Sequence, residues 1–303
     1  MEPPAQEFVT SCPICGSGDL VEGLRVVDHS ISQETFSLRD CSGCGFRSTS
    51  PRPPLISLPG YYDSVEYRSH NTSVTSFIQV AYHTIRWINL RSKYRLIRRH
   101  HSGGDLLDIG CGTGAFLRFG ERLGFSVVGV EPSARARDAA IANSVASVYA
   151  SVDELPADQR FDVITLWHAL EHVPDLHALF ASVRVRLRPG GVLVVAVPDR
   201  GSWDCAHYQA HWAAWDVPRH LWHFRGQDIG RLLAAHGFQG LTEVGAVFDA
   251  YYIALLSSRY AGSGFLSSTF AGLVFGAWSN LMALLGKRPY SSMIYVCRKL
   301  ETQ

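Results

Sequence analysis

The stretch Leu106-Leu-Asp-Ile-Gly-Cys-Gly-Thr-Gly114 decides the fold that we expect for this chain. Its apolar start predicts a buried strand, and its three glycines predict a tight turn that opens a helix over residues 115–123. A second strand over residues 126–130 ends at Glu131. Glycines at such a turn let the backbone approach a ligand closely, and an acid after the second strand can accept hydrogen bonds from both hydroxyls of a ribose. The pattern Gly-x-Gly-x-Gly differs from the Gly-x-Gly-x-x-Gly of dinucleotide sites.

Outward from this motif, apolar strand patterns alternate with helical patterns. The strands fall at residues 161–167, 192–197 and 291–297, and the helices at 135–142, 176–187 and 227–236. Strands that alternate with helices indicate an α/β fold, in which a parallel sheet is covered by helices on both faces.

Five motifs in this region together resemble the class I S-adenosylmethionine-dependent methyltransferases. They are Asp108-Ile-Gly-Cys-Gly-Thr-Gly114, Val130-Glu-Pro132, the run Ser151-Val-Asp-Glu-Leu-Pro156, the run Phe161-Asp-Val-Ile-Thr-Leu-Trp-His-Ala-Leu-Glu-His-Val-Pro174 and the run Leu187-Arg-Pro-Gly-Gly-Val-Leu193. The resemblance covers about residues 103–249. It implies a Rossmann-like, seven-stranded, mostly parallel sheet with a reversed last strand, and S-adenosylmethionine as the cofactor.

The resemblance also implies a cofactor site. The glycines would back the methionine part, Glu131 would hold the ribose, Ser151 and Val152 would border the adenine, and His168 would lie near the cofactor. The predicted cofactor-binding residues are Asp108, Gly110, Cys111, Gly112, Gly114, Glu131, Pro132, Ser151, Val152 and His168.

Two cysteine pairs with C-x-x-C spacing precede this region, and they are Cys12, Cys15, Cys41 and Cys44. Each pair is followed by a glycine that lets the backbone curl around a metal. The pattern is typical of a zinc ribbon, in which four thiolates close a tetrahedral structural Zn²⁺ site. A redox-active or metal-free pair of turns is the alternative.

Methyl transfer to a hydroxyl or an acidic carbon needs a base. His172 is the best candidate, because Glu171-His172 follows the fourth strand at the ligand-facing edge of such a sheet. Glu171 would orient His172 or act itself. The alternative is that the pair only caps the next helix and packs under the cofactor.

Residues 201–225 gather histidines and tryptophans, and we expect them to roof the acceptor pocket. His220 or Arg219 would contact a hydroxyl or phosphate of the acceptor. A tryptophan-rich packing segment is the alternative. His207 and His211, four residues apart, lack a carboxylate at ligand spacing, so a metal there is disfavoured.

Tyrosines 61, 62 and 67 follow the proline-rich connector. The resemblance implies that they fold over the cofactor, and core packing is the alternative.

The net charge and the share of charged residues limit the kinds of binding partner that we expect. The 28 basic and 27 acidic residues leave a net charge of +1, which lacks the field that drives non-specific nucleic-acid binding. Charged residues are only 18%, below the roughly 25% of an average domain, so some surface is expected to meet something other than water. The odd cysteine count and an N-terminus without a leader pattern predict a cytoplasmic protein.

Residues 260–286 contain no charge. Leu266, Phe270, Leu273, Ala277, Leu281 and Leu284 form a helical stripe there. Packing within the fold or a dimer, contact with the inner face of a membrane, and a membrane span all stay open at this point.

We therefore expect a zinc ribbon over residues 1–50, a connector and helix over 51–102, a cofactor-binding core over 103–249, and an apolar helical excursion with the last strand over 250–303. With the ribbon first, the chain resembles a bacterial subgroup linked to cell-surface glycan or lipid biosynthesis. The expected activity is methylation of a glycan, a lipid-linked or another small-molecule acceptor. An RNA methyltransferase and a non-catalytic cofactor-binding scaffold are the alternatives.

Overall fold

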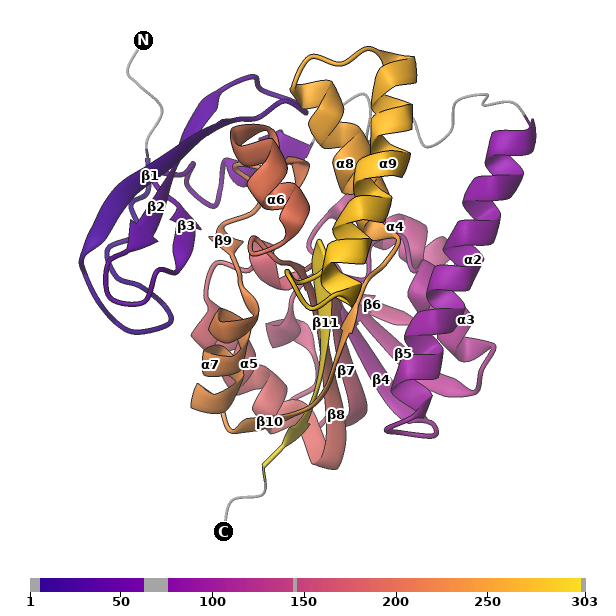
Figure 1. The fold of residues 1–303 in the computed structure, drawn as a ribbon. Coiled ribbons are helices and arrows are strands. Elements are labelled where there is room, and N and C mark those ends of the chain that lie inside the picture. The colour runs from indigo at the N-terminus through magenta and orange to yellow at the C-terminus, as the bar shows by residue number, and fades with distance from the viewer. Residues whose placement is uncertain (1–5, 63–75, 144–145, 301–303) are drawn as a thin grey trace.

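The computed structural model describes residues 6–62, 76–143 and 146–300, with the side chains of the first long helix from Trp87 onward. Its centre is a seven-stranded sheet. Helices lie on both sides of this sheet (Figure 1). The strand order is β10-β11-β8-β7-β4-β5-β6, and the strands are β4 (Gly104–Ile109), β5 (Phe125–Val130), β6 (Ser147–Tyr149), β7 (Phe161–Trp167), β8 (Leu187–Pro198), β10 (Phe238–Gly245) and β11 (Ser292–Lys299).

Strand β11 is antiparallel to both of its neighbours, whereas β4 to β8 are mutually parallel. The expected reversed last strand is therefore confirmed. The central strands are apolar on both faces, which is typical of a parallel sheet covered on both sides. On one face Leu106, Val163 and Val194 pack in one core cluster, and on the other Leu107 and Ile164 pack in a second.

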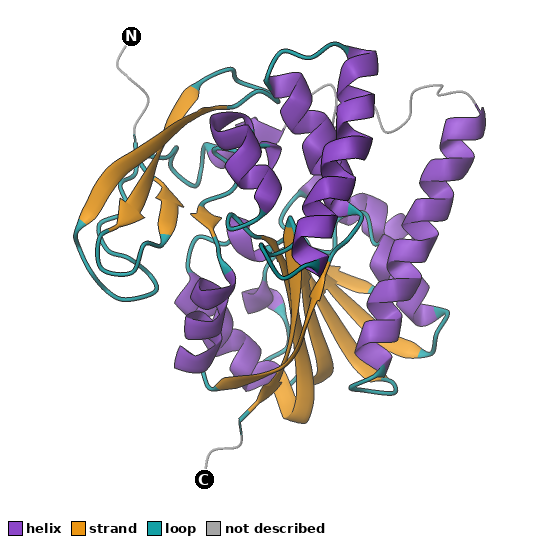
Figure 2. Ribbon diagram, viewed as in Figure 1, coloured by secondary structure: helices purple, strands orange, loops and turns teal. Residues whose placement is uncertain are grey.

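The helices divide between these two faces, as Figure 2 shows. One core cluster includes residues of α2 (Ser76–Arg98), α3 (Ala115–Glu121) and α4 (Ala134–Asn143). The other includes residues of α5 (Leu176–Arg186) and α7 (Gly226–Ala235). The helices predicted at 115–123, 135–142, 176–187 and 227–236 are confirmed.

The N-terminal residues form a second sheet of order β1-β2-β3-β9. Its strands are β1 (Leu20–Val27), β2 (Thr35–Cys41), β3 (Arg47–Thr49) and β9 (Trp222–His223). Because β9 belongs to the segment that follows the carboxyl end of β8, backbone hydrogen bonds join the N-terminal unit to that segment. A third core cluster packs Phe36 and Leu38 against Trp212, Trp215 and Ile253.

A helical hairpin, α8 (Asp249–Tyr260) and α9 (Phe265–Leu284), is inserted between β10 and β11. It stands above the carboxyl ends of the parallel strands (Figure 1). The hairpin lies in the stretch where the sequence predicts a helical excursion before the last strand. In the described part of the chain, no helix combines the length and apolarity needed to cross a bilayer. Three short helical elements lie between β8 and β9 in the sequence. They are α6 (Trp203–Tyr208), η4 (Gln209–His211) and η5 (Ala213–Trp215).

Candidate functional site

The glycine-rich loop leaves β4 in a left-handed backbone conformation. Gly110, Gly112 and Gly114 have φ values of 78°, 54° and 76°, which side chains other than glycine rarely adopt. A Cβ on Gly110 would lie 2.6 Å from the Cβ of Ala169, whereas nothing lies within 4 Å of the corresponding position on Gly112. The loop after β4 is thus pressed against the loop after β7, and its outer part is bare backbone.

Glu131 stands directly beside this loop. Its Oε2 accepts a hydrogen bond of 2.8 Å from the backbone N–H of Gly112, and its Oε1 accepts one of 2.9 Å from Ser133. A carboxylate accepts about four hydrogen bonds, so two acceptor positions stay available for a ligand. Glu131 next to an unobstructed glycine backbone fits a nucleoside with two ribose hydroxyls. Pro132 follows it at the exposed rim.

Further predicted cofactor residues lie around the glycine loop and Glu131. Asp108 is buried below the loop and accepts a hydrogen bond of 2.6 Å from Thr165 Oγ1, and burial raises its pKa to about 7. Cys111 is buried within the loop. Ser151 and Val152 come two residues after β6, whose last residue Tyr149 accepts a hydrogen bond from the Glu131 N–H. The strand order therefore places them beyond Glu131 on the same edge.

A cluster of one carboxylate and two imidazoles lies after β7. One ligand atom from each of Glu171, His172 and His220 lies within 4.8 Å of the others, a spacing that could also hold a metal ion. Glu171 is almost fully buried, and neither of its oxygens accepts a hydrogen bond from a described residue. The Nε2 of His220 lies 3.9 Å from Glu171 Oε1 and 3.7 Å from Asp216 Oδ2.

The hydrogen bonds of the two histidines define their tautomers. Nδ1 of His172 lies 3.0 Å from the carbonyl oxygen of Arg219, and Nδ1 of His220 lies 2.9 Å from that of Ala214. Because a carbonyl only accepts, both Nδ1 atoms carry hydrogen. Burial and the neighbouring His220 lower the pKa of His172 to about 4. His172 is therefore neutral near pH 7, with its lone pair on Nε2.

The surroundings of His168 raise its pKa, whereas those of His172 lower the pKa of that residue. Its Nε2 lies 2.9 Å from Asp249 Oδ2, and its Nδ1 lies 3.5 Å from Glu171 Oε1. Burial alone would lower the pKa of His168, but the two carboxylates raise it to about 10. The side chain is 37% exposed, so it borders the open edge while it carries a positive charge.

Three of the tryptophans in residues 201–225 take part in side-chain packing, the alternative to roofing an acceptor pocket. Trp212 and Trp215 are buried, and Trp203 stacks on His207 with ring centroids 4.7 Å apart. His207 and His211 do not belong to any cluster of metal-ligating atoms among the described residues.

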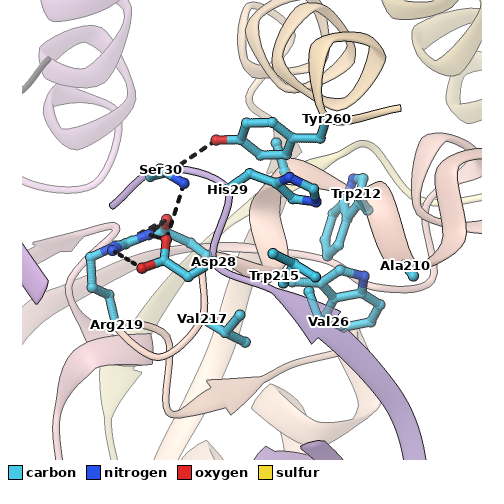
Figure 3. Close-up of a pocket in the computed structure, with 13 residues that line it drawn as sticks. Val26, Asp28, His29, Ser30, Ala210, Trp212, Trp215, Val217, Arg219 and Tyr260 are labelled. Carbon is cyan, nitrogen blue, oxygen red and sulfur yellow. Dashed lines mark hydrogen bonds and ion pairs between the residues drawn. The ribbon is translucent and has the colours of Figure 1, made fainter. Parts of the chain in front are cut away.

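Arg219 is held between two carboxylates, at 3.0 Å from Asp28 and 2.7 Å from Asp216. This ion pair borders a cavity between β1, the 210–219 segment and Tyr260 (Figure 3). The cavity measures about 10 Å³, which is room for about one water molecule and too little for an acceptor. In the described structure Arg219 therefore joins the N-terminal unit to the core.

The four cysteines converge as the spacing predicts. Their sulfur atoms lie within 4.8 Å of one another, with Cys12 and Cys44 at 3.5 Å and Cys15 and Cys41 also at 3.5 Å. The glycine after each pair has a left-handed backbone, with φ of 76° at Gly16 and 71° at Gly45. Four thiols at these distances, curled on two tight turns, fit a tetrahedral Zn²⁺.

Two residues of this edge escaped the sequence-based prediction. Asp249 begins α8, and its neighbours in sequence carry no motif that would reveal its contact with His168. Lys93 belongs to α2, and its Nζ lies 4.3 Å above the ring of Trp167. Burial lowers the pKa of Lys93, and Asp108 and Asp249 partly oppose this shift.

The tyrosines after the connector differ in position. Tyr62 places its hydroxyl 3.0 Å from His172 Nδ1, so it reaches the histidine cluster. The Tyr61 hydroxyl instead donates to Glu34 in the N-terminal unit. Tyr67 lies outside the described residues.

Comparison with known proteins gives a family and a set of relatives. A family model described as a methyltransferase domain matches residues 81–243, just over half of the chain. A ubiquinone biosynthesis O-methyltransferase of Bradyrhizobium sp. (strain ORS 278) is 36% identical over 105 residues, or 33% of this chain and 42% of the relative. The protein with that name from Paramagnetospirillum magneticum is 29% identical over 171 residues, or 50% of this chain and 66% of the relative. The match to the first relative thus spans about two fifths of that protein's length.

Among solved structures, a phospholethanolamine N-methyltransferase 2 of Haemonchus contortus is similar, in a complex with phosphomonomethylethanolamine and S-adenosylhomocysteine. It aligns with a TM-score of 0.53 and 18% sequence identity, over 82% of this chain and 62% of that one. This likeness concerns the fold.

Proposed function

Because this chain belongs to the class I S-adenosylmethionine-dependent methyltransferases, through the methyltransferase domain that matches residues 81–243, we propose that it transfers a methyl group to a hydroxyl of a small, lipid-like acceptor. The cofactor would lie along the bare backbone of Gly110 and Gly112, with its ribose on Glu131. The observation that carries the proposal is the close approach of Gly110 to Ala169, because it brings the cofactor loop against the loop that bears the histidine cluster.

When bound, S-adenosylmethionine supplies an electrophilic methyl on a sulfonium, and its departure as a neutral thioether needs no acid. The protein must therefore align the acceptor, exclude water and remove the hydroxyl proton. His172 is suited to the last task, since it is neutral and its lone pair is on Nε2. Its Nδ1–H, bound to the Arg219 carbonyl, keeps the ring in that tautomer.

Glu171 and His220 act on this base in opposite directions. The His168 and His220 side chains lower the pKa of Glu171 against the effect of burial, so its carboxylate stays charged inside the cluster. A buried negative charge stabilises the imidazolium that forms when His172 takes the acceptor proton. Glu171 is therefore placed to stabilise the imidazolium of His172, whereas His220 keeps the resting His172 neutral. The charged His168 lies on the other side of Glu171.

The acceptor class rests on two supports. The named relatives are O-methyltransferases of ubiquinone biosynthesis, which points to a hydroxyl on a lipid-like small molecule. Three arginines between the N-terminal unit and the core are also engaged with carboxylates: Arg47 with Asp40, Arg219 with Asp28 and Arg225 with Asp228. These three side chains are therefore not free to contact an RNA backbone.

The four cysteines would hold a structural Zn²⁺. Four thiolates complete the tetrahedron and leave no open coordination position, so the ion would take no part in methyl transfer. Its contribution would be to fix β2 and β3, which connect to the catalytic edge through β9.

Calorimetry with S-adenosylmethionine tests the cofactor half of the proposal, and the Glu131→Gln variant tests its placement. Incubation with methyl-labelled cofactor and hydroxylated aromatic or quinol acceptors, followed by extraction into organic solvent, tests the transfer. Absence of cofactor binding would overturn the proposal. Binding without transfer to any small-molecule fraction of a cell extract would replace it with a non-catalytic scaffold.

A further inference from the structure

Helix α9 has its polar and apolar faces reversed relative to a helix of a water-soluble protein. Its buried side consists of small and polar residues, which are Ser268, Gly272, Gly276, Ser279 and Asn280. A surface helix normally buries its large apolar side chains and exposes its polar ones. In α9 the large apolar side chains are left for the outside.

The buried side is closely fitted to the protein. A Cβ on Gly272 would lie 2.8 Å from the Cβ of Leu255, and one on Gly276 would lie 2.7 Å from the Cα of Tyr251, so the backbones of α8 and α9 approach closely. Ser279 donates a hydrogen bond of 2.8 Å to Asp204, and Asn280 donates one of 2.9 Å to the carbonyl of Val247. These contacts fix the rotation of α9 about its own axis. Small residues spaced four apart are typical of helix pairs in an apolar environment.

The outer face of α9 is a continuous row of exposed apolar side chains. It comprises Leu266, Phe270, Leu273, Val274, Trp278, Leu281, Leu284 and Leu285. The exposed fraction is 82% for Leu266, 69% for Phe270 and 73% for Leu284, so the row is open from one end of the helix to the other. A helix of 20 residues is about 30 Å long. An exposed apolar surface of this extent marks an interaction site.

Charges of one sign border the outer face. Arg259 lies at one end, with its guanidinium carbon 5.2 Å from the ring centroid of Phe265, and the exposed Lys287 and Arg288 lie at the other. Between them, residues 260–286 carry no charge, and residues 250–300 contain no acidic side chain. The partner of this face must therefore be apolar in its middle and negative at its borders.

We propose that the outer face of α9 docks on the surface of a bilayer that contains anionic lipids. Its apolar side chains would enter the boundary between headgroups and acyl chains, while Arg259, Lys287 and Arg288 contact lipid phosphates. A second copy of the chain is a poorer occupant. Whether two copies of α9 pack parallel or antiparallel, each cationic end meets another cationic end, and no carboxylate of the hairpin is available to pair with it.

Docking in this manner would bring the carboxyl ends of the parallel strands, where the glycine loop and the histidine cluster lie, close to the membrane. Helix α8 begins at Asp249, which contacts His168, and α9 returns along α8 to the same edge of the sheet (Figure 1). A lipid-soluble acceptor would then have a short path from the bilayer to the histidine cluster. The docking itself does not depend on methyl transfer, and its test below uses no activity measurement.

Co-sedimentation of the full chain with vesicles tests the docking. Vesicles of phosphatidylcholine with a quarter phosphatidylglycerol should bind the protein, and pure phosphatidylcholine should bind it less. The double variant Leu266→Glu/Phe270→Glu should bind about tenfold more weakly or worse, because it places two charges in the apolar boundary. Lys287→Glu/Arg288→Glu should lose the preference for the anionic vesicles.

The matched control is Ile56→Glu/Val185→Glu, which charges two exposed apolar residues outside the hairpin. It should bind like the unchanged protein, and an equal loss in the control would overturn the assignment to α9. No binding of the unchanged protein to anionic vesicles would overturn the proposal. So would a dimer in light scattering that Leu266→Glu/Phe270→Glu dissociates without any vesicle binding.

A second measurement avoids disruptive substitutions. Lipids brominated on their acyl chains quench tryptophan fluorescence at short range, and Trp278 lies on the outer face. Quenching should occur in the unchanged protein and should be clearly smaller in Trp278→Phe, which keeps the aromatic bulk. Equal quenching in both proteins would show that another surface meets the lipid.

Discussion

His168 and Asp249 form an ion pair of 2.9 Å that joins the loop after β7 to the first turn of the inserted hairpin. The backbone of His168 has a φ of 54°, and the carboxylate of Glu171 lies on the other side of its ring. The pair thus fixes the hairpin over the edge where the cofactor loop and the histidine cluster meet. It also determines how the protein should respond to pH.

The pH response follows from the raised pKa of His168, about 10 against an ordinary value near 6.5. Between these values the folded protein keeps a proton that the unfolded chain has released, so this stabilisation is complete below about pH 6.5 and is lost as pH rises toward 10. Asp249→Asn should be less stable than the unchanged protein at pH 6.5, and the difference should narrow by pH 9.5. Urea unfolding at several pH values measures it. Asp138→Asn, on the exposed side of α4, is the control, and a pH-independent difference would contradict the assignment.

Glu131→Gln should weaken the binding of S-adenosylmethionine by roughly ten- to a hundredfold. Hydrogen bonds to a charged group contribute about 1.5–3 kcal/mol, and the amide keeps the shape but not the charge. Titration calorimetry measures the change, with Asp138→Asn as a variant that loses an exposed acid elsewhere. Unchanged affinity in Glu131→Gln would remove the ribose from this position.

His172→Gln should lower kcat by about 10²–10⁴ if His172 is the general base. The affinity for S-adenosylmethionine should stay within about twofold, because we assign cofactor binding to the glycine loop and Glu131 and not to His172. The exposed His177→Gln on α5 should leave both quantities unchanged. A loss of cofactor affinity with normal kcat would instead assign His172 to packing beneath the cofactor.

Cys15→Ser should remove the metal. The unchanged protein is expected to carry one zinc ion per chain by elemental analysis, and the variant close to none, with a lower melting temperature because metal binding contributes to folding. Cys205→Ser changes a buried cysteine outside the cluster and should keep the full zinc content. An unchanged protein without zinc, prepared with zinc in the medium, would support the metal-free alternative.

Gly110→Ala should be more damaging than Gly124→Ala. Both positions have a positive φ, so both substitutions introduce backbone strain of about 1–2 kcal/mol. Only at Gly110 does the new methyl group also meet Ala169, at 2.6 Å, whereas nothing lies within 4 Å at Gly124. Thermal unfolding and cofactor binding should show the larger loss in Gly110→Ala. Equal losses would mean that the two loops can move apart.

Much of the fold was predictable because its signals are local. The apolar strands, the glycines of the first turn and the position of Glu131 each follow from a few adjacent residues. The same holds for the two cysteine turns, in which Gly16 and Gly45 adopt the expected left-handed backbone. These features depend on backbone sterics and short-range spacing, which a linear pattern records directly.

The site was predictable only in part because its members come from distant segments. Nothing near Asp249 indicates that it faces His168, 81 positions earlier. Helical spacing around Lys93 likewise cannot show that its helix covers Trp167 and lies near Asp108. The tryptophans of residues 201–225 were expected at an acceptor pocket, but Trp212 and Trp215 fill the space between the N-terminal sheet and α8.

By itself, the sequence determined the doubly covered parallel sheet, the cofactor loop and the cysteine cluster, because each depends on residues that are neighbours along the chain. Only the tertiary structure decided which histidine is neutral and which is charged, because their pKa values depend on carboxylates and burial contributed by other elements. It also decided that the apolar stripe of α9 faces outward, because the small residues on the opposite side of the helix are the ones that fit closely against α8.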